Sequence, residues 1–303
     1  GRRELLFGKQ RLISPLDWAN TRRTFQGVYG WVTKGQQRLD VFATRPILID
    51  PFEFDDWNSK IGFWGVYYAN EIWTCFTGEA YVLGLNRDPG TYGGVTAKEN
   101  RYTLGAHLFG ELPKTRFDYD VEGGYQLGTF GSADIRAWFL ALDLGWKLPT
   151  RRADLWWGLG FDYASGDDGS ASRQGTFNQL FPLGHAFLGF ADLIGRQNVV
   201  CTRTTLKYKP VKKLTLRADA LAFWRANRND DVYNAGGGVL RAAVPGVDDK
   251  YVGAELDLTV IWAIDRHWRV RGGWSRFWTG AFIDNTGPHQ DVDFYWAEVQ
   301  WTF

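Results

Sequence analysis

The last stretch of the chain alternates between two kinds of side chain. One side carries apolar and aromatic residues, namely Tyr295, Ala297, Val299, Trp301 and Phe303. The other side carries Glu298, Gln300 and Thr302. Strict alternation of this kind is typical of a strand that meets lipid on one face and water on the other. Because the pattern recurs along most of the sequence, and a bilayer admits only helices and edgeless barrels, the sequence predicts an all-β, antiparallel transmembrane β-barrel.

Composition narrows the classes of protein further. The chain has 303 residues with 16 Trp, 13 Tyr and 21 Phe, and two aromatic girdles at the membrane interfaces would use that excess. Its formal charge of +1 provides no global basic field, so we expect no nucleic-acid partner. No apolar run approaches the roughly 20 residues of a spanning helix, which excludes helical membrane proteins.

Period-two alternation predicts about fourteen strands, each of about 9 to 11 residues or somewhat longer. They centre on residues 3–11, 25–34, 37–46, 60–70, 75–87, 101–112, 117–129, 134–148, 154–165, 198–209, 214–226, 250–264, 268–282 and 291–303. Connections alternate between short and long, as in bacterial barrels with short periplasmic turns and long outer loops, with the short connection at residues 129–133 as the one exception. The long ones are predicted at residues 12–24, 47–59, 88–100, 166–197, 227–249 and 283–290. This parity places Phe303 at the periplasmic rim of a multi-pass protein of the bacterial outer membrane, embedded in its lipid.

Residues 1–303 are expected to form a single barrel domain that lacks N-terminal strands. The sequence has no Met and no signal peptide, and its first residues, GRRELLFGKQ, have the pattern of the middle of a folded element. The two cysteines, Cys75 and Cys201, fall on strands predicted to lie far apart, so both are expected to be unpaired thiols.

Alternation also assigns an inner face, on which charges of both signs lie. Its predicted basic residues are Arg38, Arg101, Arg203, Lys207, Lys209, Arg217, Arg225, Arg269 and Arg271. Its predicted acidic residues are Glu79, Asp118, Asp120, Glu122, Asp143, Asp162, Asp219, Glu255, Asp257 and Glu298. Arg276 departs from the pattern, because it shares the lipid face with Trp274 and Trp278 unless it snorkels or a bulge shifts the register.

The inner arginines suggest a path for an anionic solute. A guanidinium is always charged and offers a planar fork to a carboxylate, and several weak sites suit passage better than one strong site. The candidate substrate-binding residues are Arg203, Lys207, Arg217, Arg225, Arg269, Arg271, Arg38 and Arg101. In the alternative interpretation, these cations pair with the inner carboxylates, including Glu79, Asp219, Glu255 and Asp257, and only hold the wall.

The connection at residues 166–197 is too long and too apolar for a solvated turn. We expect it to fold over or into the mouth of the barrel, where it would gate or narrow the pore through Phe177, Phe181, His185 and Asp192. His185 has no second His or Cys at metal-ligand spacing, so no metal or cofactor is expected.

Catalytic signatures are missing from the sequence. There is no G-x-S-x-G elbow, no H-E-x-x-H pair and no P-loop, and the chain has 4 histidines. The sequence therefore favours a protein that is not an enzyme.

Two stretches go beyond pattern. The segment GRRELLFGKQRLISPLDWANTRRTFQGV at residues 1–28 and the segment FNQLFPLGHAFLGFADLIGRQN at residues 177–198 resemble GRQ-type and GHAY-type segments of the alginate export family. The resemblance implies a barrel of about 18 strands, about four of them absent here, lined by arginines that receive uronate carboxylates.

The leading hypothesis is therefore a passive outer-membrane pore that moves an anionic polysaccharide or oligosaccharide outward, with periplasmic export machinery as a further partner. Two alternatives stay open: a general or organic-anion diffusion porin, and a structural or binding barrel that loop 166–197 plugs permanently.

Overall fold

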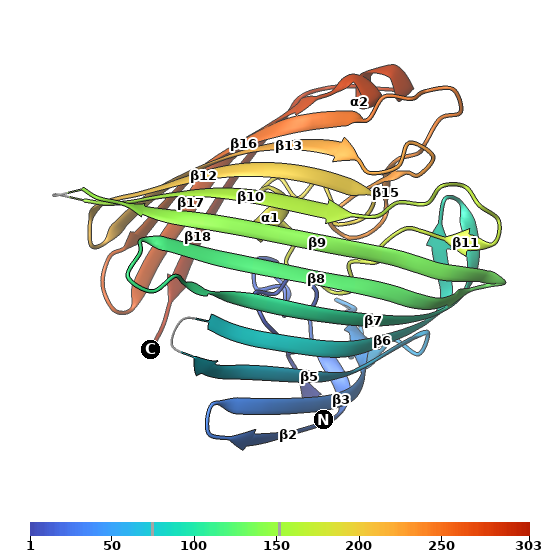
Figure 1. Ribbon diagram of the computed structural model, residues 1–303, viewed down its shortest axis with the longest axis horizontal. Helices are drawn as coiled ribbons and strands as arrows, with labels where there is room; N and C mark the ends of the chain where they lie inside the picture. The colour runs from blue at the N-terminus through green and yellow to red at the C-terminus, as the bar shows by residue number, and fades with distance from the viewer. Residues whose placement is uncertain (74–75, 151–152) are drawn as a thin grey trace.

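One large antiparallel sheet makes up most of the computed structural model, which describes residues 1–73, 76–150 and 153–303 (Figure 1). Each strand pairs with its neighbours in the chain, so the topology is an up-and-down meander. The strands on this path are β1 (Arg2–Arg3), β2 (Phe25–Lys34), β3 (Gln37–Leu48), β5 (Ile61–Trp73), β6 (Phe76–Tyr92), β7 (Val95–Glu111), β8 (Phe117–Phe130), β9 (Ala133–Leu148), β10 (Asp154–Ala164), β12 (Val199–Val211), β13 (Leu214–Arg225), β16 (Tyr251–Ala263), β17 (Trp268–Thr279) and β18 (Val292–Trp301).

Short elements lie beside this path. β4 (Asp56–Trp57) pairs with β3, and β11 (Arg173–Gln174) pairs with β9. β14 (Val232–Tyr233) and β15 (Val239–Arg241) form a separate pair, and the helices are α1 (His185–Leu188) and α2 (Ala281–Thr286). Within the described ranges, no helix has the length and apolar character needed to cross a membrane.

Alternation along each strand separates the two faces of the sheet. In β9, Ala137, Phe139 and Ala141 are buried on the concave side, whereas Trp138 and Leu142 are exposed on the convex side. An exposed apolar band on the convex face is what a hydrocarbon environment requires. The fold class predicted from the sequence, a transmembrane-type antiparallel barrel wall of about fourteen strands, is confirmed.

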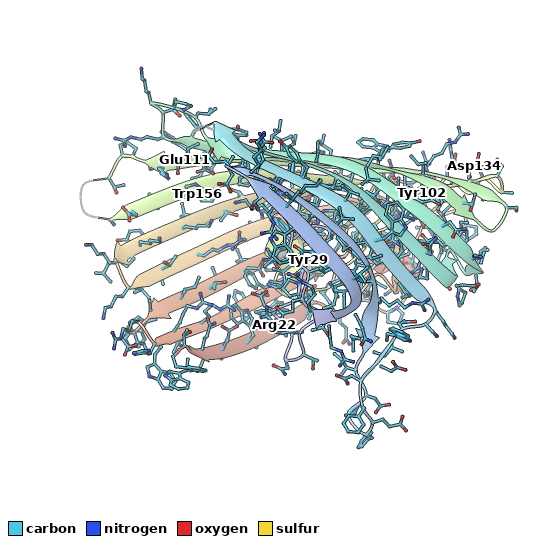
Figure 2. All side chains as sticks on the ribbon, turned by 90° about the horizontal axis from the view of Figure 1, so that it is seen from below. Arg22, Tyr29, Tyr102, Glu111, Asp134 and Trp156 are labelled. Carbon is cyan, nitrogen blue, oxygen red and sulfur yellow. The ribbon has the colours of Figure 1, made fainter. Side chains whose placement is uncertain are left out.

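The wall is curved and open along one line (Figure 2). Among the residues that the structure describes, no ladder joins β18 to β1 or β2, which are the two ends of the pairing path. The final strand keeps the predicted alternation, because Tyr295, Val299 and Trp301 are exposed on the convex face.

The predicted strand at residues 3–11 is wrong. Only Arg2 and Arg3 pair with β2, after which the chain turns at Gly8 and Gln10, both with positive φ (54° and 67°), and runs inside the curved wall. There Phe7 stacks on Tyr67, with ring centroids 4.6 Å apart. The alternation in this segment fits the inner surface of the barrel, where Arg11 finds carboxylates that lipid would not provide.

Residues 166–197 also lie inside the wall, where they pair with the N-terminal segment. The two chains form a parallel bridge at Ile13 and Phe181, in which the Ser14 N–H donates to the Phe181 oxygen at 2.9 Å and the Phe181 N–H donates to the Leu12 oxygen at 2.9 Å. We call residues 4–24 and 166–197 the inner segments.

The predicted long loop at residues 88–100 is also wrong. Strands β6 and β7 continue through most of it and meet at a two-residue turn, Gly93–Gly94, where φ is 52° and 75°. Two adjacent residues with positive φ make the turn type that matches the twist of a hairpin, and Gly is the residue that adopts it without strain.

Two smaller expectations have different outcomes. Cys201 is a buried free thiol, whereas Cys75 lies outside the described residues. Arg276 does lie on the convex face, near the end of β17 that is followed by a longer connection, and it forms ion pairs with Asp291 at 3.3 Å and Asp293 at 3.4 Å. These pairs explain how a charge is accommodated there without a shift of register.

Candidate functional site in the lumen

Arg11 lies on the concave side of the wall, among carboxylates of β8 and β9. Its fully buried guanidinium contacts Asp120 at 2.6 Å, Glu122 at 3.2 Å and Asp143 at 2.6 Å. Burial alone lowers the pKa of Arg11, but the surrounding carboxylates outweigh it and raise that pKa above its ordinary value. Arg11 therefore pins the first inner segment to strands β8 and β9.

Arg196 pins the second inner segment in the same way. Its guanidinium donates to Asp162 on β10 at 2.7 Å and to the backbone oxygen of Arg11 at 3.3 Å. Phe187 of α1 lies close to both guanidiniums, 4.5 Å from that of Arg11 and 5.2 Å from that of Arg196. The two inner segments are thus linked to each other as well as to the wall.

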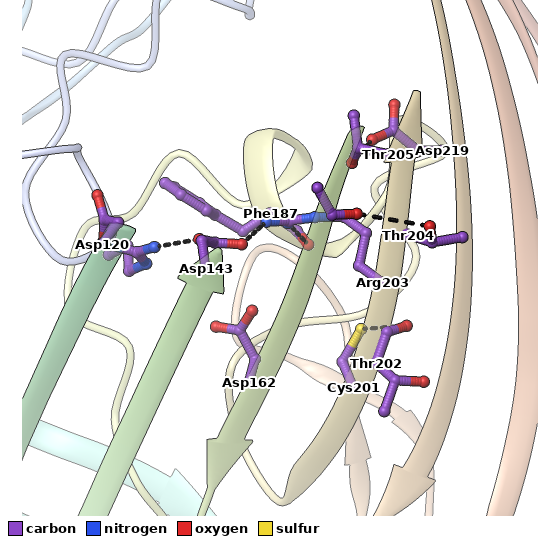
Figure 3. Close-up of polar contacts among 12 residues, drawn as sticks. Asp120, Asp143, Asp162, Phe187, Cys201, Thr202, Arg203, Thr204, Thr205 and Asp219 are labelled. Carbon is purple, nitrogen blue, oxygen red and sulfur yellow. Dashed lines mark hydrogen bonds and ion pairs between the residues drawn. The ribbon is translucent and has the colours of Figure 1, made fainter. Parts of the chain in front are cut away.

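Arg203 on β12 completes this cluster (Figure 3). It donates to Asp143, which it shares with Arg11, and to the backbone oxygen of Phe187 at 2.6 Å. The side chain is only 10% exposed. The Arg203 guanidinium therefore binds the wall and the second inner segment at once.

His107 extends the polar cluster toward β6. Its two ring nitrogens lie 2.7 Å from Glu79 and 3.1 Å from Asp120. Tyr67 donates to Glu79 at 2.8 Å, and Tyr81 donates to Glu122 at 2.9 Å. Each inner carboxylate of this region therefore has more than one partner.

Glu255 and Asp257 on β16 hold the second inner segment by its backbone. Glu255 accepts the Ala191 N–H at 2.9 Å, and Asp257 accepts the Phe190 N–H at 3.3 Å. The wall approaches so closely that a Cβ at Gly189, where φ is 97°, would lie 2.4 Å from Glu255. Glycine is required there by both conformation and space.

His185 and Asp192 lie together on the second inner segment, 4.0 Å apart. Burial, helped by Arg271 and Arg217, lowers the pKa of His185 to about 3, so the imidazole is neutral. Burial raises the pKa of Asp192 to about 6. Trp18 from the first inner segment packs on His185, with ring centroids 4.4 Å apart. Phe177 and Phe181 belong to the same packed interior.

Most of the other candidate arginines also have carboxylate partners. Arg217 pairs with Asp219 at 2.6 Å, Arg101 with Glu99 at 2.6 Å and Arg38 with Asp40 at 2.8 Å. Arg225 instead binds backbone oxygens of the connection that follows it, among them Arg228 at 2.7 Å and Val247 at 3.2 Å. It therefore braces this connection.

A cleft of about 580 Å³ lies between β17–β18 and residues 17–22 of the first inner segment. Arg22, Arg269 and Arg271 line it with two indoles, Trp18 and Trp296, and the carboxylates Asp17 and Glu298. Arg271 pairs with Glu298, and Arg269 donates to Gln300. Arg22 in turn pairs with Glu4 at 2.5 Å, so each of the three guanidiniums in the lining has a partner, and the cleft is large enough for a sugar ring.

Sequence reasoning did not assign a role to Arg11 or Arg196. A signal was present, since both lie in similar short stretches, GKQR at residues 8–11 and GRQN at residues 195–198, inside the two segments that carry the family resemblance. In the described parts of the chain, no group of three or more His, Cys, Asp or Glu residues is arranged to hold a metal ion.

Comparisons with known proteins agree with this architecture. The structure is similar to that of OccK11 (OpdR) from Pseudomonas aeruginosa, with a TM-score of 0.62, 14% identity, and coverage of 98% of this chain and 76% of the other. It is also similar to the outer membrane protein OprD from the same organism, with a TM-score of 0.55, 12% identity, and coverage of 98% and 74%. At these identities the likeness shows a shared fold.

No curated protein sequence matches the chain. A family model does: the one described as alginate export matches residues 1–296. The fold and the family together indicate a pore protein of the bacterial outer membrane, and the chain belongs to the alginate export family.

Proposed function

We propose that this outer-membrane pore passes an anionic polysaccharide or oligosaccharide, of the alginate kind, by passive diffusion guided by cations in the lumen. The observation that carries the proposal is the cleft in which Arg22, Arg269 and Arg271 surround Trp18 and Trp296. Guanidiniums bind carboxylates through paired hydrogen bonds, and indoles bury the apolar faces of ligands. A sugar that carries a carboxylate needs both.

The ion pairs in the cleft favour passage over tight binding. Arg271 and Glu298 are only 25% and 29% exposed, so an incoming carboxylate must compete with Glu298 for the guanidinium. Glu298 loses its partner while the solute is bound and regains it when the solute leaves, which opposes tight binding. The solute can therefore be released as readily as it is taken up, as conduction requires.

The test is single-channel recording in a planar bilayer, with reversal potentials in a salt gradient and an oligouronate added to one side. Replacing both Arg269 and Arg271 by Gln should shift the reversal potential toward cation selectivity and weaken the block. Arg276→Gln is the control, because it removes an arginine from the same strand on the lipid face, and it should leave the reversal potential unchanged. An unchanged reversal potential in the double variant would exclude arginine guidance.

A second candidate function, a barrel that the inner segments close permanently, is favoured by the buried pairs of Arg11 and Arg196. Deleting residues 177–192 distinguishes the two. A permanently closed barrel conducts only after the deletion, whereas a gated pore conducts before it. The general or organic-anion diffusion porin predicts conductance with no block by an oligouronate.

A further inference from the structure

A second cleft, of about 470 Å³, lies on the inner face where β9, β10 and β12 approach their short connections. Its charged and aromatic lining consists of Lys147, Asp154, Trp156, Lys207 and Lys209. In bacterial barrels the short turns are periplasmic, so this cleft belongs to the periplasmic end of the lumen. It is separated in the sheet from the cleft at β17–β18 by β13 and β16.

The Trp156 indole lies flat on the wall. Two neighbouring glycines make room for it, because a Cβ at Gly145 or Gly158 would lie 2.4 Å or 2.2 Å from the ring. Its N–H donates to Asp118 on β8 at 2.7 Å, which fixes the ring in its plane. One face of the indole is thus covered by backbone, and the other is directed into the lumen.

Two of the lysines beside this ring, in the described part of the chain, lack a close carboxylate partner. The Lys207 ammonium lies 4.1 Å from the ring centroid of Trp156. Within residues 1–73, 76–150 and 153–303, neither Lys207 nor Lys209 has a carboxylate oxygen within 4.0 Å. Lys147 has a partner, Glu111 at 2.6 Å, but this pair is largely exposed and so contributes little. This contrasts with the guanidiniums farther inside, most of which are paired with carboxylates.

We propose that Trp156, Lys207 and Lys209 form a subsite for one carboxylated sugar ring at the periplasmic end of the pore. The Lys207 ammonium, which covers the lumen face of the indole, moves aside to pair with the carboxylate, and that face of the indole then stacks on the C–H face of the sugar ring. Because Lys207 already contacts the indole, it needs only a small movement to meet the acid group. This inference deepens the proposed function and rests on it.

The experiment measures block of single channels by an oligouronate added from the periplasmic side, compared with a neutral oligosaccharide of equal length. Trp156→Ala should shorten the blocked time by roughly threefold to tenfold, the contribution typical of an aromatic contact. Lys207→Gln should reduce the preference for the charged sugar over the neutral one. Trp156→Phe keeps an aromatic plate without the N–H and should retain most of the block.

Controls come from adjacent positions. Trp157→Ala removes an indole of the same size from the convex face, where Trp157 is exposed, and should leave the block unchanged. Lys212→Gln removes a charge in the turn after β12 and should also have no effect. If Trp156→Phe is blocked as well as the wild-type pore, replacement of this indole does not by itself prevent folding. A shorter blocked time in Trp156→Ala then reports the loss of stacking.

The outcomes separate the subsite from the function on which it rests. If the wild-type pore is blocked by the oligouronate and both Trp156→Ala and Lys207→Gln are blocked equally well, the subsite is wrong and the proposed function stands. If no oligouronate blocks the wild-type pore from either side, while salt currents persist, both proposals are overturned. Equal block by charged and neutral sugars would retain the stacking plate and exclude the role of the lysines.

Discussion

Replacing Arg11 by Ala should release the first inner segment and increase the conductance of the pore. The guanidinium is completely buried and binds three carboxylates on β8 and β9. Removing one partner of a buried ion pair costs about 3–5 kcal/mol, because the remaining charge is left without compensation. The lower end of that range applies here, since His107, Tyr81 and Arg203 still contact the three carboxylates.

A loss of about 3 kcal/mol corresponds to roughly a 100-fold change in the equilibrium between docked and released inner segment. In single-channel recordings, openings that are rare in the wild-type protein should become frequent. Lys9→Ala is the control, because Lys9 lies two residues from Arg11. Its ammonium lies 4.5 Å from the centroid of the Phe109 ring, a contact that stabilises the docked segment by about 1 kcal/mol or less. Equal open probability in Arg11→Ala and wild-type protein would refute the conclusion that this residue holds the segment.

Three further predictions concern other parts of the structure. Burial raises the pKa of Asp192 to about 6 from its usual value of 3.8, so its contribution to docking of residues 166–197 is present below about pH 4 and is lost as the pH rises through 6. His185 acts in the opposite direction, because its pKa is lowered to about 3 and its contribution is lost as the pH falls below about 6.5. The open probability of Asp192→Asn should therefore be higher at pH 5 than at pH 7.5, and that of His185→Gln should be higher at pH 7.5 than at pH 5; two variants with the same pH dependence would contradict this assignment. Replacing Arg225 by Ala removes its hydrogen bonds to backbone oxygens and its contact with the Phe282 ring at 3.7 Å, which should destabilise residues 227–249 by about 3 kcal/mol. These residues should then become sensitive to protease in intact cells. Resistance equal to that of the wild-type protein would show that this connection does not depend on Arg225. Gly94→Ala places a side chain where φ is 75° and should destabilise the β6–β7 hairpin by about 1 kcal/mol, measured as a lower melting temperature. Gly30→Ala is the control, because Gly30 lies in β2 without a positive φ and with open space where its Cβ would lie; no loss in Gly94→Ala would be inconsistent with the turn geometry.

The strands follow from the sequence because the signal for a membrane strand is local. In β9 and β18, each residue shows its side of the wall by its polarity, and a one-residue change of register would invert the whole pattern. The extension of β6 and β7 was not predicted because the residues beyond the membrane are polar on both faces and do not alternate. The adjacent Gly93 and Gly94 nevertheless indicate a hairpin turn.

The length and apolar content of residues 166–197 indicate a segment that folds inward, but the path of the first inner segment could not be derived from the sequence. Leu5 and Phe7 have strand-like spacing, and nothing local distinguishes burial inside a barrel from exposure to lipid. The partners of Arg11 lie more than 100 residues away in the chain, on β8 and β9. Pairing between such distant charges is fixed by the curvature of the whole wall and the path of the inner segments, so the sequence predicts charged inner faces without predicting which charges meet.

The distribution of charge between wall and inner segments gives the inner segments an effect on selectivity. Asp120, Glu122, Asp143 and Asp162 belong to the wall, whereas Arg11 and Arg196, which neutralise them, belong to the inner segments. If both inner segments were withdrawn together, Arg203 would remain beside Asp143 and His107 beside Asp120, but the carboxylates of this part of the lumen would outnumber the remaining cations and repel a polyanion. The inner segments therefore act as counterions that are tethered to the wall. Movements that open the pore but keep Arg11 and Arg196 near the wall would leave the pore permeable to anions. Complete withdrawal of both segments would make the pore cation-selective.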